Sequence, residues 1–312
     1  MSIASGRQAT MKFFHSPKYE VDLGEHILPT IKFRLIKEKL IELGVARAEE
    51  FEEVSPAQDE DILLVHTSTY LDKLRRGALT PDELAVLDLP FSQELVEAAW
   101  IGVKGTIGAA RYALETGLGI HIGGGGHHAY PDYGAGYCVL NDGAIAIRKL
   151  KREGRIVKAM VVDCDVHQGD GTAFIFHGDP SVFTCSIHQE DLYPEIKQQS
   201  DLDIGLLSGT GDDVYLEELS RHFLPALEIF HPHLLIFVAG ADPYQDDQEG
   251  GLRLTLEGLE RRDQIIFEEA RRKRVPVVVV LAGGYAQKTA DTVTIHVNTI
   301  RTGLEIIGRG KG

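Results

Sequence analysis

The stretch "KAMVVDCDVHQGDG", residues 158–171, joins a short run of apolar, β-branched residues to the ionisable side chains Asp163, Asp165 and His167. A run of this kind predicts a strand that is buried on both faces of a sheet. In open α/β sheets, ligands bind beyond the carboxyl ends of the strands. The stretch therefore predicts a central strand with a functional site at its end.

Similar runs and amphipathic segments alternate along the chain. We expect further strands in "DILLVH" (61–66), "GIHIGG" (119–124), "SVFTCSIH" (181–188), "HLLIFVAGAD" (233–242) and "VPVVVVLAGGY" (275–285), and helices over 92–116, 141–154, 213–230 and 256–273. Asn141 and Asp142 are suited to cap the second of these helices, and Gly154 to end it. The alternation predicts a mainly parallel, three-layer α/β/α fold, and the lack of a linker or repeat favours a single domain over residues 1–312.

Composition excludes several classes of function. The formal net charge of −15 disfavours nucleic acid and modestly favours a cationic substrate. Cys138, Cys164 and Cys185 lack CxxC spacing, so we expect reduced thiols. The apolar runs are shorter than the ~20 residues of a membrane span, and segment 1–14 lacks a signal-peptide core. We therefore expect a cytoplasmic protein without a membrane span, and its oligomeric state stays open.

Polar residues collect at the ends of five predicted strands: His127 and His128; Asp163, Asp165, His167 and Asp170; Ser186 and His188; Asp242; and Gly283, Gly284 and Tyr285. Asp165 and His167 are two apart and can face the same ion. With Asp242 they offer two carboxylates and one imidazole and leave a position open for water, which is typical of catalytic zinc. Such ligands also accept Fe(II), Co(II) or Mn(II). An isolated Asp-x-His pair would be weak evidence for a metal site. The polar residues at the other strand ends strengthen this interpretation.

The double histidine follows four glycines, Gly123 to Gly126, and no lysine suited to a phosphate loop accompanies them. We interpret the glycines as a close-approach turn that brings His127 and His128 over the metal position. Asp163 and Asp170 can each accept an N–H from one imidazole. With Tyr285 as a donor to an oxyanion, this set favours hydrolysis of an amide or an ester.

Five motifs together resemble the zinc-dependent histone deacetylase family of the arginase/deacetylase superfamily. They are "GGGGHHAYPDYGAGYCVLND" (123–142), "VVDCDVHQGDGTAFIF" (161–176), "CSIHQEDLYP" (185–194), "AGADPYQDD" (239–247) and "LAGGY" (281–285). The match extends to "FFHSPKYEVD" (13–22) and "VHTSTYLDKL" (65–74), and it is nearest to the class IV branch and its bacterial relatives. The resemblance implies the arginase/deacetylase fold and hydrolysis of N-ε-acyl-lysine that carries acetyl or longer acyl groups.

The resemblance also implies roles for individual residues. Asp165, His167 and Asp242 would bind zinc, His128 would shuttle a proton, His127 would assist electrostatically, and Tyr285 would donate to the oxyanion. Asp170 and Asp163 would support His128 and His127, respectively. The narrow acyl-lysine channel would be lined by Gly136, Tyr137 and Tyr193. A structural potassium ion would be held by Asp163, Asp165, His167, Ser186 and Ile187.

Other functions stay open from the sequence. A deacetylase of small acetylated amines, such as polyamines, would use the same residues, and an acyl-lysine binding module would need only the pocket. A binuclear manganese ureohydrolase is disfavoured because Gln168 and Tyr244 occupy the positions where further carboxylates are needed. Among the other histidines, His26 alone is expected near the mouth of the site.

Overall fold

Eight parallel strands form one sheet in the computed structural model, which describes residues 11–308. Residues 1–10 and 309–312, including most of segment 1–14, lie outside the described part. The strand order is β2-β1-β3-β8-β7-β4-β5-β6. The strands are β1 (Phe13–His15), β2 (Phe51–Glu53), β3 (Leu118–His121), β4 (Ala159–Asp163), β5 (Val182–Gln189), β6 (Leu202–Leu206), β7 (Leu235–Val238) and β8 (Val277–Val280).

Helices connect the strands and cover the sheet. They are α1 (Lys32–Glu42), α2 (Asp59–Ile62), α3 (Ser68–Arg76), α4 (Pro81–Leu87), α5 (Gln93–Thr116), α6 (Asp142–Arg152), α7 (Asp170–Phe176), α8 (Asp212–Phe230), α9 (Leu256–Lys273) and α10 (Thr289–Gly303). Two 3₁₀ turns, Pro17–Tyr19 and Ala48–Glu50, and a π turn, Leu304–Gly308, complete the elements of the described part.

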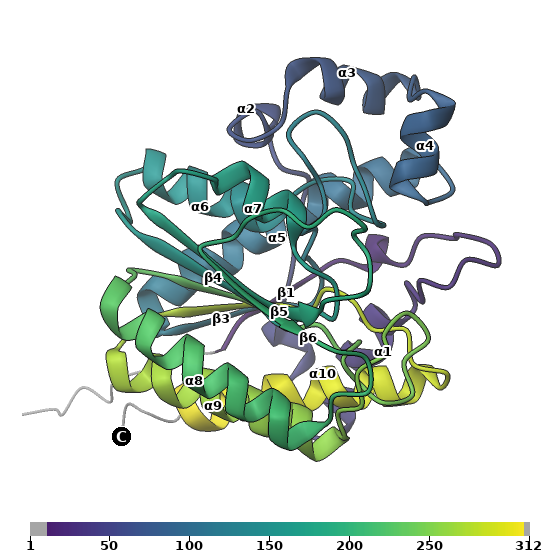
Figure 1. Cartoon of the computed structure of the whole chain (residues 1–312). Coiled ribbons are helices and arrows are strands. Elements are labelled where there is room, and N and C mark those ends of the chain that lie inside the picture. Colours follow the sequence, from purple (N-terminus) through teal and green to yellow (C-terminus); the bar gives the residue numbers. More distant parts are fainter. Residues whose placement is uncertain (1–10, 309–312) are drawn as a thin grey trace, which may run out of the picture.

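The sheet separates two hydrophobic cores, so the predicted three-layer α/β/α fold is confirmed. Helices α5, α6 and α7 cover one face, and α1, α8, α9 and α10 cover the other (Figure 1). Alternate residues of β7 face opposite layers: Ile236 packs in the core under α5 and α6, and Phe237 packs in the core over α8 and α9. Both faces are thus dry, which explains why the strands read as continuous apolar runs.

Most predicted elements are present, but "DILLVH" (61–66) is not a strand. Its first residues end α2, whose opening turn carries Asp59, Glu60 and Asp61. Carboxylates favour a helix N-terminus, and this local preference overrides the β-branched composition. The strands β1, β2 and β6 and helices α1, α3, α4, α7 and α10 were not predicted. The three-residue strands β1 and β2 and the short helices α3, α4 and α7 leave little periodic signal, whereas β6, α1 and α10 are longer and were missed.

The start of α6 ties the fold to the site. Asn141 caps the helix as predicted, since its Oδ1 accepts from the Ala144 N–H at 3.0 Å. Asp142 does not cap the helix; its carboxylate accepts from the backbone N–H groups of Gly125 and Gly126 at 3.0 and 2.7 Å. The helix therefore anchors the glycine turn that precedes the double histidine.

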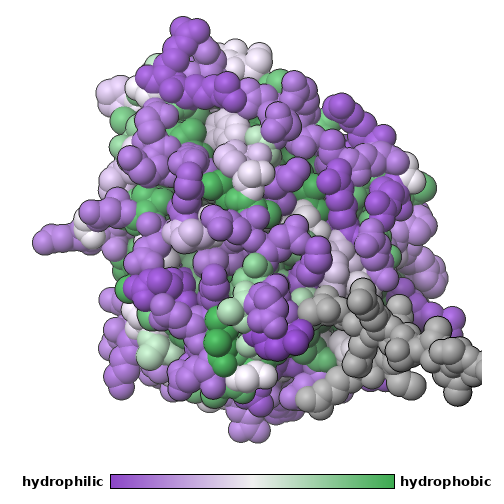
Figure 2. All heavy atoms as spheres, turned by 180° about the vertical axis from the view of Figure 1, so that it is seen from behind, coloured by the Kyte–Doolittle hydropathy of each residue, from purple (hydrophilic) through white to green (hydrophobic). Residues whose placement is uncertain are grey.

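The rest of the chain adds two observations. Within residues 11–308, no helix combines the length and the apolar character needed to cross a membrane. Seen from behind, the surface is mostly hydrophilic, with hydrophobic side chains scattered between (Figure 2). The single-domain organisation of residues 1–312 stays a prediction.

Candidate active site

The carboxyl ends of β4 and β7 bring three buried ligand-type side chains together. One oxygen or nitrogen atom from each of Asp165, His167 and Asp242 lies within 4.8 Å of the others. His167 Nδ1 is 3.1 Å from Asp165 Oδ1 and 3.7 Å from Asp242 Oδ2. The predicted ligand set therefore converges, although Asp165 and His167 follow the end of β4 and are not part of the strand.

The electrostatics of this cluster suit a divalent cation. Burial and the negative charge of Asp165 raise the pKa of Asp242 to about 7. Oδ1 of Asp242 accepts from the Val166 N–H at 2.9 Å, whereas its Oδ2 is buried without a hydrogen-bond partner. An unpartnered buried carboxylate oxygen is costly. Two carboxylates and one imidazole match a three-ligand catalytic metal site.

The two adjacent histidines differ in their electrostatic surroundings. His127 donates from Nδ1 to Asp163 Oδ2 at 2.8 Å, and His128 donates from Nδ1 to Asp170 Oδ1 at 2.6 Å. Although burial disfavours the cation, Asp163 and Asp165 raise the pKa of His127 to about 9. Burial, followed by the charge of His127, lowers the pKa of His128 to about 4. His128 is therefore the neutral imidazole of the pair.

The four glycines are required by close contacts. A Cβ atom on Gly126 would meet the Leu140 carbonyl oxygen at 2.0 Å, and one on Gly125, where φ is +91°, would meet Ala282 at 2.6 Å. Behind the turn, Asp142 accepts from Thr106 Oγ1 at 2.5 Å, and Thr106 contacts His121 Nδ1 at 2.8 Å. This buried support was missed, because a threonine inside a helix carries no sequence signal for it.

A second turn, residues 282–285, lies against the ligands. The Gly283 N–H donates to Asp165 Oδ2 at 2.9 Å, and a Cβ atom at Gly283 would meet Asp242 Oδ2 at 1.8 Å. The Tyr285 N–H donates to Asp247 Oδ2 at 2.6 Å. Sequence reasoning missed this role of Asp247, although the residue lies inside the quoted motif 239–247. The turn brings Tyr285 to the site.

The predicted channel residues line the entrance of a cavity of about 470 Å³. The Tyr193 ring lies 4.9 Å from the His128 ring, and the Tyr137 ring lies 5.9 Å from the Tyr285 ring. Gly136 is needed between them, since a Cβ atom there would meet His128 Cδ2 at 2.7 Å. His26 also lies here, with its ring 4.8 Å from the Tyr137 ring.

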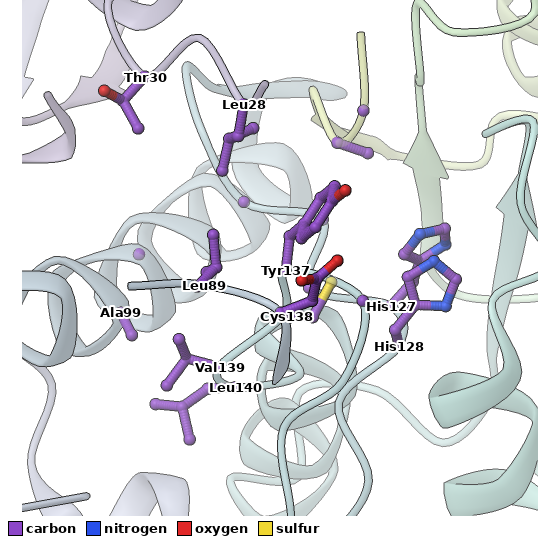
Figure 3. A pocket seen from close by; sticks show the side chains of 18 of the residues that line it. Leu28, Thr30, Leu89, Ala99, His127, His128, Tyr137, Cys138, Val139 and Leu140 are labelled. Atoms are coloured by element: carbon purple, nitrogen blue, oxygen red, sulfur yellow. The ribbon is translucent and has the colours of Figure 1, made fainter. Parts of the chain in front are cut away.

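The same cavity also has an apolar arm, which lies across Tyr137 from the histidines (Figure 3). In Figure 3, Leu89, Ala99, Val139 and Leu140 gather on one side of Tyr137, and the imidazoles of His127 and His128 lie on the other. Ala98 and Ala99 of α5 contribute only methyl groups to the cavity wall, and Gly102 contributes backbone. The cavity therefore has room for an apolar group well beyond two carbons.

The residues expected at a potassium site are also adjacent. Asp163 and Ser186 are register partners on β4 and β5, and Ile187 follows Ser186. The Ser186 hydroxyl contacts His188 Nδ1 at 2.9 Å, and Asp163 Oδ1 accepts from the Asp165 N–H at 3.1 Å. The pairing of β4 with β5 brings these groups together next to His127, whose Nδ1 contacts Asp163.

The α/β/α fold and the buried site agree with a family of deacetylases and related amidohydrolases. Residues 26–300 match the histone deacetylase domain, and the chain belongs to that family of deacetylases. It is 42% identical over 272 residues to an uncharacterized protein of Picosynechococcus sp., covering 87% of this chain and 91% of that protein. It is 30% identical over 289 residues to histone deacetylase 2 of Arabidopsis thaliana, covering 89% and 75% of the two chains.

The fold is also that of a solved structure. The crystal structure of the HDA15 HD domain superposes with a TM-score of 0.75 over 95% of both chains at 21% sequence identity. At this identity the likeness concerns the fold, and it agrees with the parallel three-layer arrangement described above.

The opposite pKa shifts of the two histidines can be measured. In metal-free protein at pH 7, we expect His127 to show the ¹⁵N shifts of an imidazolium, because its pKa is raised to about 9, and His128 those of a neutral ring, because its pKa is lowered to about 4. Asp163→Asn should lower the His127 pKa, and Asp132→Asn, on the surface, should not. Identical protonation of both rings at pH 7 would contradict the assignment.

Proposed function

We propose that this protein is a divalent-metal-dependent lysine deacylase that hydrolyses the amide of N-ε-acyl-lysine. The observation that carries the proposal is the buried convergence of Asp165, His167 and Asp242, with one Asp242 oxygen left without a partner. The double histidine and Tyr285 lie in the same cavity. Zinc is the ion we favour, and Fe(II) or Co(II) fit the same ligands.

The proposed mechanism divides the work among the side chains around the cluster. The bound ion would polarise the scissile carbonyl and lower the pKa of a water molecule. His128, neutral and oriented by Asp170, accepts the proton of the attacking water at Nε2 and returns it to the lysine amine that leaves. His127, kept cationic by Asp163, stabilises the negative charge that develops nearby. The Tyr285 hydroxyl donates a hydrogen bond to the oxyanion.

Further parts of the proposal concern ions and location. We propose that Asp163, Ser186 and Ile187, with Asp165 and His167, hold a structural potassium ion, which the adjacency of β4 and β5 supports. A cytoplasmic location is supported by Cys138, Cys164 and Cys185, which are unpaired thiols. A single catalytic domain over residues 1–312 is part of the same proposal.

Replacing the proposed oxyanion donor tests the chemistry. Tyr285→Phe should reduce turnover of an acyl-lysine peptide about 10²–10³-fold, the usual effect of losing one such donor, with metal content unchanged. Tyr215→Phe is a matched control, since this buried hydroxyl lies on α8 and has no hydrogen-bond partner. Full activity of Tyr285→Phe would exclude its assigned role.

The apolar arm of the cavity supports acyl groups longer than acetyl. Cavities of about 300–1,000 Å³ hold drug-sized ligands, whereas an acetyl group needs far less room. We therefore expect turnover of octanoyl or myristoyl lysine in a panel that also contains acetyl, lactyl and butyryl peptides. Ala99→Leu should fill the arm and reduce kcat/KM for the long chains by at least about tenfold relative to acetyl.

The control for this experiment adds the same volume elsewhere. Ala78→Leu, at an exposed position outside the cavity, should leave the chain-length profile unchanged. Equal losses for acetyl and myristoyl substrates in Ala99→Leu would contradict the long-chain assignment. Turnover of no substrate in the panel, with zinc present, would instead favour an acyl-lysine binding module.

A second candidate, deacetylation of small amines such as polyamines, is favoured by one observation. Glu249 and Asp88 both line the cavity. Burial is the largest cause that raises the pKa of Tyr137 to about 12, and the negative charges of these two carboxylates are the next largest. Both carboxylates therefore act on the channel entrance. The far ammonium group of a monoacetylated diamine would be attracted to this acidic rim.

Neutralising the rim separates the two candidates. If small amines are the substrates, Glu249→Gln should reduce kcat/KM for a monoacetylated diamine about tenfold, through the loss of one charge contact, and affect a peptide with neutral flanks much less. Glu53→Gln, an exposed change on β2, is the control. A wild-type preference for peptides, with no effect of Glu249→Gln on the diamine, would reject the second candidate.

A further inference from the structure

Lys32 is a buried cation beside the site that no step of the proposed mechanism uses. It is the first residue of α1, its exposed fraction is 0%, and it is the one fully buried lysine among residues 11–308. A positive charge at a helix N-terminus opposes the helix dipole. Burial adds a desolvation cost unless partners offset it. Its position therefore indicates strong compensating interactions.

The Lys32 ammonium supports the turn that carries Tyr285. Its Nζ donates to the Ala282 carbonyl oxygen at 2.8 Å and lies 5.6 Å from the centre of the Tyr285 ring. Ala282 has φ of +52°, a left-handed conformation that is unfavourable for a residue with a Cβ atom. The next residue, Gly283, donates its N–H to Asp165. Lys32 thus holds a strained turn against a proposed metal ligand.

The same ammonium interacts electrostatically with several buried carboxylates. Burial lowers the pKa of Lys32 to about 8, and the charges of Asp242, Asp165 and Asp247 oppose this shift, in that order. Each of these aspartates is buried, and Asp242 Oδ2 lacks a hydrogen-bond partner. Lys32 therefore remains mainly protonated at pH 7, and its charge offsets part of the negative charge at the site.

We propose that Lys32 is a positioning residue and a built-in counter-cation, which holds the 282–285 turn and offsets the buried carboxylates before a divalent cation binds. This inference rests on the proposed function, because it takes Asp165, His167 and Asp242 as the ligands of that cation. Lys32 and the ion neutralise the same carboxylates, so each weakens the benefit of the other. Their contributions to folding are then negatively coupled.

The coupling gives a signature that a purely packing role lacks. Removing the Lys32 charge should destabilise the metal-free protein more than the zinc-loaded protein. It should also tighten zinc binding by about tenfold, because a repulsive neighbouring charge is gone. A residue that only packs or shapes the site would, when changed, weaken zinc binding.

The experiment uses the full chain and two variants of Lys32. Lys32→Met removes the charge and the donor, whereas Lys32→Gln removes the charge and keeps a donor for Ala282. Lys37→Met is the matched control, since Lys37 lies on the same helix with its ammonium 5.2 Å from the Phe51 ring. Thermal unfolding is measured without metal and with zinc, and zinc affinity is measured by competition with a chelator.

The inference is supported if both Lys32 variants show a larger zinc-induced rise in melting temperature than the wild type and tighter zinc binding, while Lys37→Met matches the wild type. A variant that folds only with zinc also supports the inference, because zinc then stabilises the variant more than it stabilises the wild type. A zinc-induced rise no larger than that of the wild type, weaker zinc binding, or failure to fold even with zinc overturns it. If the wild type itself binds no zinc, the proposed function fails instead.

Discussion

Burial of negative charge at one edge of the sheet is the constraint on which the rest of the site depends. Asp165 and Asp242 are 1% and 0% exposed, and Asp163, Asp170 and Asp247 lie buried around them. Such a group of carboxylates is stable only with donors, cations or a metal ion close by. The surrounding elements supply the hydrogen-bond donors and the cations, which come from five separate segments of the chain.

The donors come from backbone that approaches unusually closely. The N–H groups of Val166 and Gly283 donate to Asp242 and Asp165, respectively. That approach requires glycine, because Cβ atoms at Gly240 and Gly283 would overlap the ligand carboxylates. Glycine-rich motifs and ligand residues therefore occur together in this sequence for one steric reason, and a phosphate group has no part in it.

Two buried cationic side chains hold backbone close to the sheet edge. Arg262 on α9 is fully buried, donates to the Gly240 carbonyl oxygen at 2.6 Å and pairs with Asp263 at 2.8 Å. It fixes the backbone between β7 and Asp242 from the layer below, as Lys32 contacts the 282–285 turn from α1. Helices α1 and α9, which cover the same face of the sheet, thus both support this polar edge.

How far the sequence could predict this site follows from where its parts lie in the chain. The ligand residues and the double histidine directly follow apolar strands, so periodicity alone locates them at one edge. The contact of Lys32 with Ala282 spans 250 residues, and α1 has no strong pattern of its own. Thr106 and His121 meet only after α5 packs on β3. Such contacts depend on tertiary packing, which local patterns do not encode.

The different protonation of two adjacent, identical side chains also depends on tertiary structure. His127 and His128 have ring centres 4.0 Å apart, yet His127 faces Asp163 and Asp165 and becomes the cation. Burial, and then the charge of His127, disfavours a proton on His128, which leaves that ring neutral. Burial of carboxylates therefore determines both the protonation of the two histidines and the negative charge at the proposed metal position, so that the proposed metal binding and acid–base roles share one electrostatic origin.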